Sequence, residues 1–293
     1  MMRISIFFSL FVALPAQSAL LQNYVEVQQQ LQELATRSPK VVQIFDLATN
    51  DTGELIQGVR IGSGAVHNLV VGTHHGNEYG SSEVALAVAK SLANSPLAEQ
   101  TVFVIPVLNT SGFDHRARAE QSRGVAHDPN RDYPGPCATE GPFTLKSTKA
   151  LADFIEKEKI VASATLHTHY PGVVYPWGFS TKDLNTPYLD LFRELTAFAT
   201  QESKYKIGNS AELIYPADGT FEDYAFWRHG IWSILFELGF SHSPTESEVA
   251  TMIEQNVPGI RRLLEKSPTS RALDHEFHGR CDLTLRSLDR HDE

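Results

Sequence analysis

The chain has 293 residues, of which 42% are apolar, so it can bury one large hydrophobic core and form one or two domains. Its formal net charge is −10, and its 25 lysines and arginines are scattered rather than clustered. This charge distribution argues against nucleic acid or an anionic membrane as a partner. A small molecule or a peptide is the better candidate.

The first 19 residues have the layout of a secretory signal peptide. Arg3 precedes an apolar stretch of about eleven residues, and small residues follow up to Ala19. This stretch is too short to span a bilayer, and no later stretch is long enough. We therefore expect cleavage just after Ser18 or Ala19. The mature chain, residues 20–293, is then expected to form one catalytic domain and a monomer in the periplasm or the extracellular medium.

The chain has two cysteines, Cys137 and Cys281. Export makes a disulfide permissible, and such a bond would tie the C-terminal tail to the loop after "NRDYPGP". Two free buried thiols are the alternative, because two cysteines form no diagnostic spacing pattern.

Apolar strands and amphipathic helices alternate along the mature chain. Val27, Leu31 and Leu34 recur at helical spacing, and Pro39 closes this first helix. The predicted helices are residues 24–37, 81–93, 144–158, 186–201, 220–230 and about 246–266. The predicted strands are residues 40–47, 54–62, 67–74, 101–109, 160–169 and 231–239. This alternation predicts the α/β class, with three layers, α/β/α, around a mixed and largely parallel central sheet.

Three of the predicted strands end in residues that can carry chemistry. Their sequences are "VVGTHHGNE", "SATLHTH" and "SILFELG". In open α/β sheets, ligands bind beyond the carboxyl ends of the strands, so we expect these residues to meet at one site. Glu237 lies within an apolar strand, where an unpaired carboxylate is energetically costly. Glu237 therefore needs a partner.

A divalent metal ion would supply that partner. His75 and Glu78, spaced H-x-x-E, can converge on one ion, and His167 can give a third ligand from a neighbouring strand end. Two imidazoles and one carboxylate, with a fourth position left to water, are typical of a catalytic zinc site. Taken alone, H-x-x-E also fits a capping histidine and a surface glutamate. His74 should point away from the metal and act structurally.

Five segments, in order between about Leu69 and Gly239, resemble motifs of the M14 zinc carboxypeptidases. "HHGNE" resembles the first metal motif of that family, and "LHTHYPGVVYPWG" resembles the segment with the third ligand. "HDPNRDYP" resembles the segment that binds the substrate carboxylate. "IYPADGTFEDYAF" and "ILFELG" resemble the segments with the mobile tyrosine, the specificity pocket and the catalytic glutamate. The resemblance implies one zinc ion on His75, Glu78 and His167, and carboxylate binding by Asn130 and Arg131. It also implies that Tyr215 is the mobile tyrosine, that Glu222 lines the specificity pocket and that Glu237 is the catalytic glutamate.

The sequence also departs from the family pattern. Asn77 stands where many members carry an arginine that contacts extended substrates. The arginine that polarises the scissile carbonyl must lie in "DHRARAEQSRG", and we favour Arg118 over Arg116 and Arg123. The segment before the first motif is shorter than the activation prodomain of the digestive relatives. We therefore expect an enzyme that is active once exported.

The resemblance predicts a metallopeptidase that removes one residue from a peptide C-terminus, with Glu237 as general base and Arg118 stabilising the oxyanion. Glu222 takes the pocket position at which an acidic residue accompanies a preference for basic ends. Substrates would then end in lysine, arginine or the diaminopimelate of a muropeptide. Alternatively, Glu222 turns outward at the start of its helix.

Two other functions stay open. One is an N-acyl amino acid deacylase of the succinylglutamate desuccinylase or aspartoacylase type, which shares the metal motif and an "NR" segment. The other is a binding protein that keeps the fold without turnover, which the departures at Asn77 and at the arginine would fit.

Overall fold

The computed structural model describes residues 20–137 and 143–281. The predicted signal peptide, residues 1–19, lies outside these residues and stays a prediction. In the described part of the chain, no helix is both long and apolar enough to cross a lipid bilayer.

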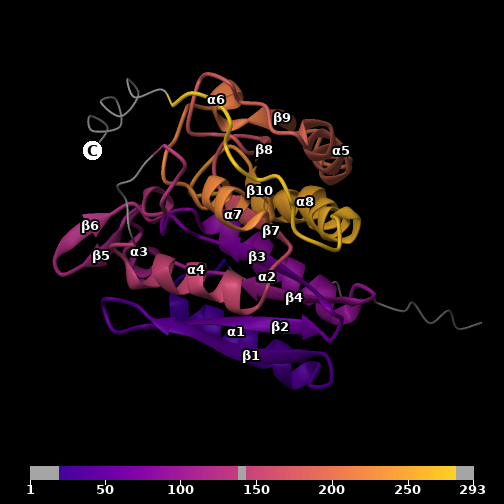
Figure 1. The fold of residues 1–293 in the computed structure, drawn as a ribbon. Coiled ribbons are helices and arrows are strands. Elements are labelled where there is room, and N and C mark those ends of the chain that lie inside the picture. Colours follow the sequence, from indigo (N-terminus) through magenta and orange to yellow (C-terminus); the bar gives the residue numbers. More distant parts are fainter. Residues whose placement is uncertain (1–19, 138–142, 282–293) are drawn as a thin grey trace, which may run out of the picture.

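An eight-stranded sheet forms the centre of the molecule (Figure 1). Its strands are β1 (Val42–Thr49), β2 (Leu55–Gly62), β3 (Val66–Gly72), β4 (Gln100–Ile105), β7 (Ala162–His167), β8 (Gly172–Tyr175), β9 (Lys206–Asn209) and β10 (Trp232–Glu237). They lie in the order β1-β2-β4-β3-β7-β10-β8-β9. The four central strands β4, β3, β7 and β10 run parallel, and β8 and β9 are parallel to each other. The pairs β1–β2, β2–β4 and β8–β10 are antiparallel.

Helices cover both faces of this sheet. Apolar side chains of α1 (Tyr24–Arg37), α2 (Tyr79–Asn94), α5 (Leu189–Ala199) and α8 (Glu246–Lys266) pack in one buried cluster. Those of α4 (Lys146–Lys157) and most of those of α7 (Phe221–His229) pack in another, on the opposite face. The predicted α/β class with a mixed, mostly parallel sheet is therefore confirmed.

Several short elements were not predicted. They are β8, β9, α3 (Thr110–His115), α6 (Ser210–Leu213), the 3-10 turn η1 (Pro129–Arg131), and the hairpin of β5 (Glu120–Ser122) and β6 (Val125–His127). Each is too short to show a period, and β8 lies between Tyr170-Pro171 and Pro176, which read as a loop. The β5–β6 hairpin projects from the edge of the molecule (Figure 1).

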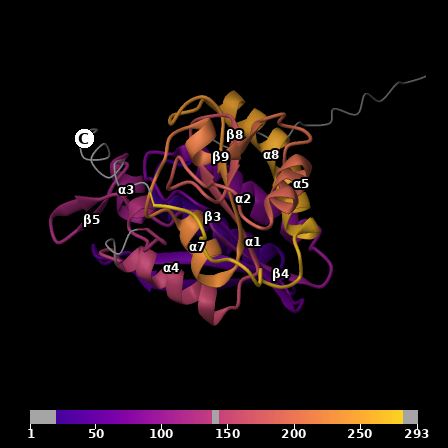
Figure 2. The same cartoon turned by 45° about the horizontal axis from the view of Figure 1, so that its top comes forward.

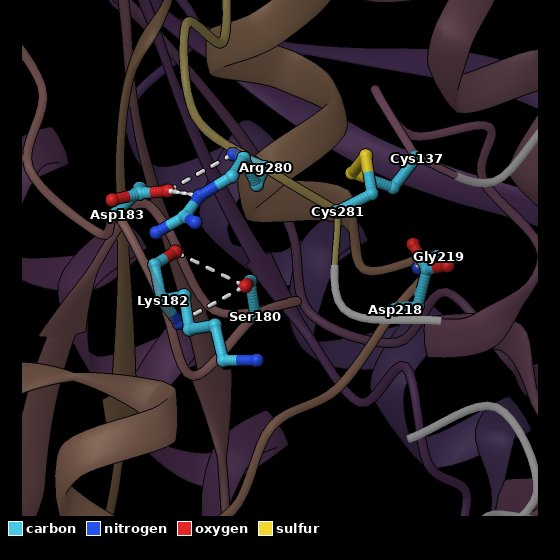
Figure 3. The surroundings of a disulfide bond; sticks show 8 residues. All are labelled: Cys137, Ser180, Lys182, Asp183, Asp218, Gly219, Arg280 and Cys281. Atoms are coloured by element: carbon cyan, nitrogen blue, oxygen red, sulfur yellow. Dashed lines mark hydrogen bonds and ion pairs between the residues drawn. A yellow bond between two sulfur atoms is a disulfide. The ribbon is translucent and has the colours of Figure 1, made fainter. Parts of the chain in front are cut away.

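Cys137 and Cys281 form a disulfide, with Cα atoms 5.5 Å apart (Figure 3). This finding decides between the two states that the sequence left open. The bond joins the segment after η1 to the end of the described chain, across 144 residues of sequence.

Candidate metal centre and active site

The strand ends that carry the candidate ligands and Glu237 meet at the carboxyl ends of the central strands. β3, β7 and β10 are adjacent and parallel, so their carboxyl ends lie side by side. His167 is the last residue of β7, and Glu237, the last residue of β10, is its direct neighbour in the register. His75 follows the end of β3, and Glu78 immediately precedes α2. The topology alone therefore brings these four residues together.

Gly76 explains why the segment between His75 and Glu78 folds so tightly. A Cβ atom at this position would lie 2.0 Å from the backbone carbon of Gly112 and 2.3 Å from the nitrogen of Phe113, so only glycine fits against α3. The Gly76 amide donates a hydrogen bond to the carbonyl of Arg118 at 3.2 Å. The first metal motif is thus fixed to the chain segment that carries Arg118.

His75, Glu78 and His167 form a buried cluster whose ligand atoms all lie within 4.8 Å of one another. Nδ1 of His75 is 2.8 Å from Oε1 of Glu78, and Nδ1 of His167 is 3.0 Å from Oε2 of the same carboxylate. The two Nδ1 atoms are 3.2 Å apart. Burial opposes the charge on Glu78, but His75 and His167 hold its pKa far below the ordinary value. Burial disfavours the charged form of His75 too, yet Glu78 and Asp128 raise its pKa to about 9.

This donor set fits a zinc ion. Tetrahedral zinc with bonds of about 2.0 to 2.1 Å separates its ligand atoms by about 3.3 Å, close to the distances between these three side chains. The Nδ1 atoms of His75 and His167 face each other, and both cannot donate a hydrogen bond to the other. A cation between them can accept the lone pair of each nitrogen.

Asp128 is a site residue that the sequence analysis missed. Its Oδ1 lies 3.0 Å from Nε2 of His75, on the side of the ring away from the cluster. Histidine ligands commonly donate their second ring N–H to a carboxylate, which fixes the tautomer and orientation of the ring. The signal was available in "HDPNR", where Asp128 stands two positions before Asn130.

Arg118 is the one of the three candidate arginines that reaches the site. Its Nε and NH2 groups contact Oδ2 of Asp128 at 2.9 and 2.8 Å, and its NH1 is 3.9 Å from Oε1 of Glu78. The guanidinium of Arg116 instead lies over the Tyr79 ring, 3.3 Å from its centroid. Arg123 is exposed in the turn of the β5–β6 hairpin. The geometry therefore favours Arg118 for the role at the carbonyl.

Glu237 faces the cluster without being tied to it. Among the described residues, none donates a hydrogen bond to its carboxylate. Burial, together with the negative charge of Glu78, raises the pKa of Glu237 to about 7 in the protein alone. A carboxylate with such a pKa can both accept and return a proton near neutral pH.

Asn130 and Arg131 lie next to the cluster on η1. Oδ1 of Asn130 accepts a hydrogen bond from the amide of Phe221 at 2.9 Å. This bond fixes the side chain and directs its NH2 group elsewhere; that group has no acceptor in the described part of the chain. Arg131 donates from NH2 to the hydroxyl of Tyr215 at 3.1 Å, and Tyr215 is 47% exposed. The predicted carboxylate-binding pair and the predicted mobile tyrosine are thus in contact.

Glu222 points inward. Its side chain is only 5% exposed and makes a hydrogen bond with the hydroxyl of Thr165 on β7. Thr165 lies two residues before His167, on the same face of that strand. The alternative of an outward, solvated Glu222 is therefore wrong. Its role in a specificity pocket stays a prediction.

His74 lies behind the cluster, as expected. It is fully buried, its ring stacks on that of His167 with centroids 5.4 Å apart, and its Nε2 lies 3.2 Å from the hydroxyl of Tyr133. Burial and the two neighbouring histidines lower its pKa well below the ordinary value. His74 thus supports His167 from behind as a neutral ring.

The fold and the side-chain cluster together define the class of zinc peptidases built on a mixed α/β sheet. Comparison with protein families gives the same answer: the zinc carboxypeptidase model matches residues 27–259. The chain belongs to this family.

Individual relatives are more distant. The chain is 26% identical to human carboxypeptidase B over 252 residues, which are 71% of this chain but only 60% of that protein. The structure of bovine thrombin-activatable fibrinolysis inhibitor with tick carboxypeptidase inhibitor matches with a TM-score of 0.76 at 17% identity, over 85% of this chain and 97% of that one. Murein-tripeptide amidase MpaA from Escherichia coli O157 matches with a TM-score of 0.51 at 17% identity, over 77% and 92%.

Proposed function

We propose that this protein is an exported zinc carboxypeptidase that hydrolyses the last peptide bond of its substrates. The observation that carries the proposal is the convergence of His75, Glu78 and His167 with Glu237 at one sheet edge, beside Arg118. Family membership supports the reaction. The signal-like residues 1–19 and the Cys137–Cys281 disulfide support export, since disulfides persist in oxidising compartments.

The residues of the chain divide the work of hydrolysis. His75, Glu78 and His167 would hold a zinc ion, which would supply a Lewis acid that lowers the pKa of water and polarises a carbonyl. Glu237 accepts a proton from the attacking water and passes it to the leaving amine. Arg118, already directed toward Glu78, stabilises the negative charge that develops on the carbonyl oxygen.

The substrate carboxylate is held by Asn130 and Arg131. The planar guanidinium of Arg131 offers paired hydrogen bonds to a carboxylate, and the free amide NH2 of Asn130 adds a donor. Tyr215 then moves from its contact with Arg131 to cover the bound end and exclude water.

Glu222 gives the enzyme its preference for a cationic terminal side chain. The carboxylate of Glu222 is buried against the face of β7 that carries Thr165 and His167. A cation beside it would form a partly desolvated ion pair. Peptides ending in lysine or arginine fit this pocket. Muropeptides fit too, since diaminopimelate carries a side-chain ammonium, and the likeness to a murein-tripeptide amidase makes them worth testing.

Metal removal tests the proposal. We expect dialysis against a strong chelator to abolish release of C-terminal residues, and added zinc to restore it. Full activity in a preparation shown by elemental analysis to contain no metal would refute it. Assaying acyl amino acids beside peptides separates the carboxypeptidase from a deacylase, and the contact between Tyr215 and Arg131 favours the former.

A further inference from the structure

Residues 267–281, here called the C-terminal strap, follow α8 and lie beyond residue 259, where the family match ends. The strap passes across α7 as the yellow segment of Figure 2. It runs from the amino ends of the central strands, which lie opposite the metal cluster, toward the loops around the site. Its contacts therefore connect two distant parts of the molecule.

The first part of the strap is anchored at the amino ends of β7 and β10. Arg271 donates hydrogen bonds to the carbonyls of Ile155 and Ile160, both at 2.8 Å, and pairs with Glu156. The Ala272 amide donates to the carbonyl of Gly230 at 2.7 Å. This part of the strap is firmly attached, but at the end of the sheet opposite the metal cluster.

The middle of the strap packs against the loop that follows β8. The Phe277 ring meets those of Trp177 and Phe179 edge to face, with centroids 5.5 and 4.7 Å away. Gly178, between these two aromatic residues, donates its amide to the buried carboxylate of Asp223. The strap thus braces the loop that is bonded to the neighbour of Glu222.

The end of the strap is attached at two points, Asp183 and Cys137 (Figure 3). The amide and the Nε of Arg280 both donate to Oδ2 of Asp183, at 3.2 and 3.0 Å. Cys281 is bonded to Cys137, at the end of the segment that begins with Arg131. That segment also contacts the loop after Tyr215, because the Tyr133 amide donates to the carbonyl of Gly219 at 3.1 Å.

We propose that the C-terminal strap, closed by the Cys137–Cys281 disulfide, positions the pair Asn130 and Arg131 and thereby sets the affinity for the substrate carboxylate. This inference rests on the proposed function, which gives that pair its role. A bidentate guanidinium needs its partner within a fraction of an ångström, so a loosened Arg131 loses affinity. The zinc ligands and Glu237 lie on strand ends and at the start of α2, and none of the strap contacts described above involves them. KM should therefore respond to the strap while kcat does not.

The test uses the full chain with both cysteines replaced, Cys137→Ser with Cys281→Ser. A matched control, Arg271→Gln, removes contacts of the first part of the strap and lowers stability, while the Phe277 packing, the Arg280–Asp183 contact and the disulfide stay in place. All variants are assayed well below their midpoints of thermal unfolding, with zinc content, kcat, KM and the inhibition constants of free L-lysine and free L-leucine measured side by side. These amino acids report on the carboxylate site without turnover.

We expect the double variant to keep its zinc and a kcat within about twofold, while KM and the inhibition constants rise about tenfold. The control should keep the wild-type KM. Reducing wild-type protein with a dithiol, then removing the dithiol and restoring zinc without oxygen, should reproduce the effect: the S–S bond breaks, each sulfur takes a proton, the dithiol closes to its own disulfide, and reoxidation restores the low KM. This second measurement decides the matter if the double variant does not fold.

An unchanged KM and unchanged inhibition constants in the folded double variant, or in the reduced wild type, would overturn the inference. A fall in kcat or a loss of zinc at constant KM would overturn it as well. Failure of the proposed function looks different, because wild-type protein itself would then release no C-terminal residue.

Discussion

Asp128 and His75 are joined on the side of the imidazole that faces away from the metal cluster. Oδ1 of Asp128 is 3.0 Å from Nε2 of His75, whose Nδ1 points to Glu78. The other oxygen of the same carboxylate binds Arg118 at 2.8 Å. The positive partners outweigh the cost of burial and hold the pKa of Asp128 well below its ordinary value. One ionised carboxylate thus orients both a metal ligand and the group proposed to stabilise the oxyanion.

We predict that Asp128→Ala weakens zinc binding by about 10-fold to 100-fold, because the His75 ring loses the acceptor that fixes its orientation. Competition with a chelator of known affinity measures the change. The matched control is Asp153→Ala, which removes a carboxylate that pairs with Lys149 on the exposed face of α4. Equal zinc affinity in the two variants would remove Asp128 from the metal site.

The variant Glu237→Gln separates metal binding from catalysis. It leaves His75, Glu78 and His167 unchanged, so we expect full zinc content. An amide cannot accept the proton of water, so kcat should fall by at least about 10²-fold to 10⁴-fold. Elemental analysis and steady-state kinetics on the same preparation provide both numbers. Turnover at the wild-type rate would show that another group is the base.

The three arginines after α3 provide their own controls. Arg118→Ala should lower kcat by about 10²-fold to 10³-fold, as expected for a lost donor to the developing oxyanion. Arg116→Ala and Arg123→Ala should stay near wild type, since one guanidinium covers Tyr79 and the other lies in the hairpin turn. A larger loss in either control than in Arg118→Ala would transfer the role to that residue.

The sequence predicted the metal cluster because the relevant information is local. His75 follows the apolar strand β3, Glu78 precedes the helix after it, and His167 ends the apolar strand β7; parallel strands place such ends together. The edge elements were harder to predict. β8 and β9 are four-residue strands whose pairing depends on partners far along the chain.

The roles of Asp128, Arg118 and the strap become definite only in the folded structure. Asp128 becomes part of the site only when η1 is folded against the end of β3, which no periodicity encodes. Three arginines within a few residues look alike until the backbone assigns their directions. The pairing of Cys137 with Cys281 likewise required the path of residues 267–281 across α7.

Glu120 provides a test of stability away from the catalytic residues. It is fully buried on β5, and its Oε2 accepts a hydrogen bond from the Ser147 hydroxyl at 2.5 Å. Its Oε1 has no partner among the described residues. Burial raises the pKa of Glu120 from 4.5 to about 8. Between these two pH values, Glu120 therefore keeps its proton in the folded protein and loses it in the unfolded chain.

Between about pH 4.5 and pH 8 this difference lowers stability as pH rises, by up to about 1.4 kcal/mol per pH unit for this group. The contribution is complete below the unfolded pKa and lost as pH increases toward the folded one. We predict that Glu120→Gln flattens the dependence of unfolding free energy on pH over this range. Urea unfolding of both proteins from pH 5 to pH 8 measures the slopes, and parallel profiles would show that Glu120 does not titrate as described.

We predict that the substrate preference depends on Glu222, whose buried carboxylate is hydrogen-bonded to the Thr165 hydroxyl. If the cation of a C-terminal lysine pairs with it in a partly desolvated pocket, the contact contributes about 1 to 3 kcal/mol, or roughly tenfold to a hundredfold in kcat/KM. Glu222→Gln keeps the shape and the bond to Thr165 but removes the charge, so the preference for lysine over leucine should fall by a similar factor.

The neighbouring Asp223 does not serve as a control for this charge removal, because its carboxylate accepts a hydrogen bond from the Gly178 amide. Glu248→Gln, at an exposed position in the first turn of α8, is the matched charge removal and should leave the preference unchanged. Wild-type protein that cleaves C-terminal leucine or phenylalanine faster than lysine, arginine and diaminopimelate would show that Glu222 does not set the specificity.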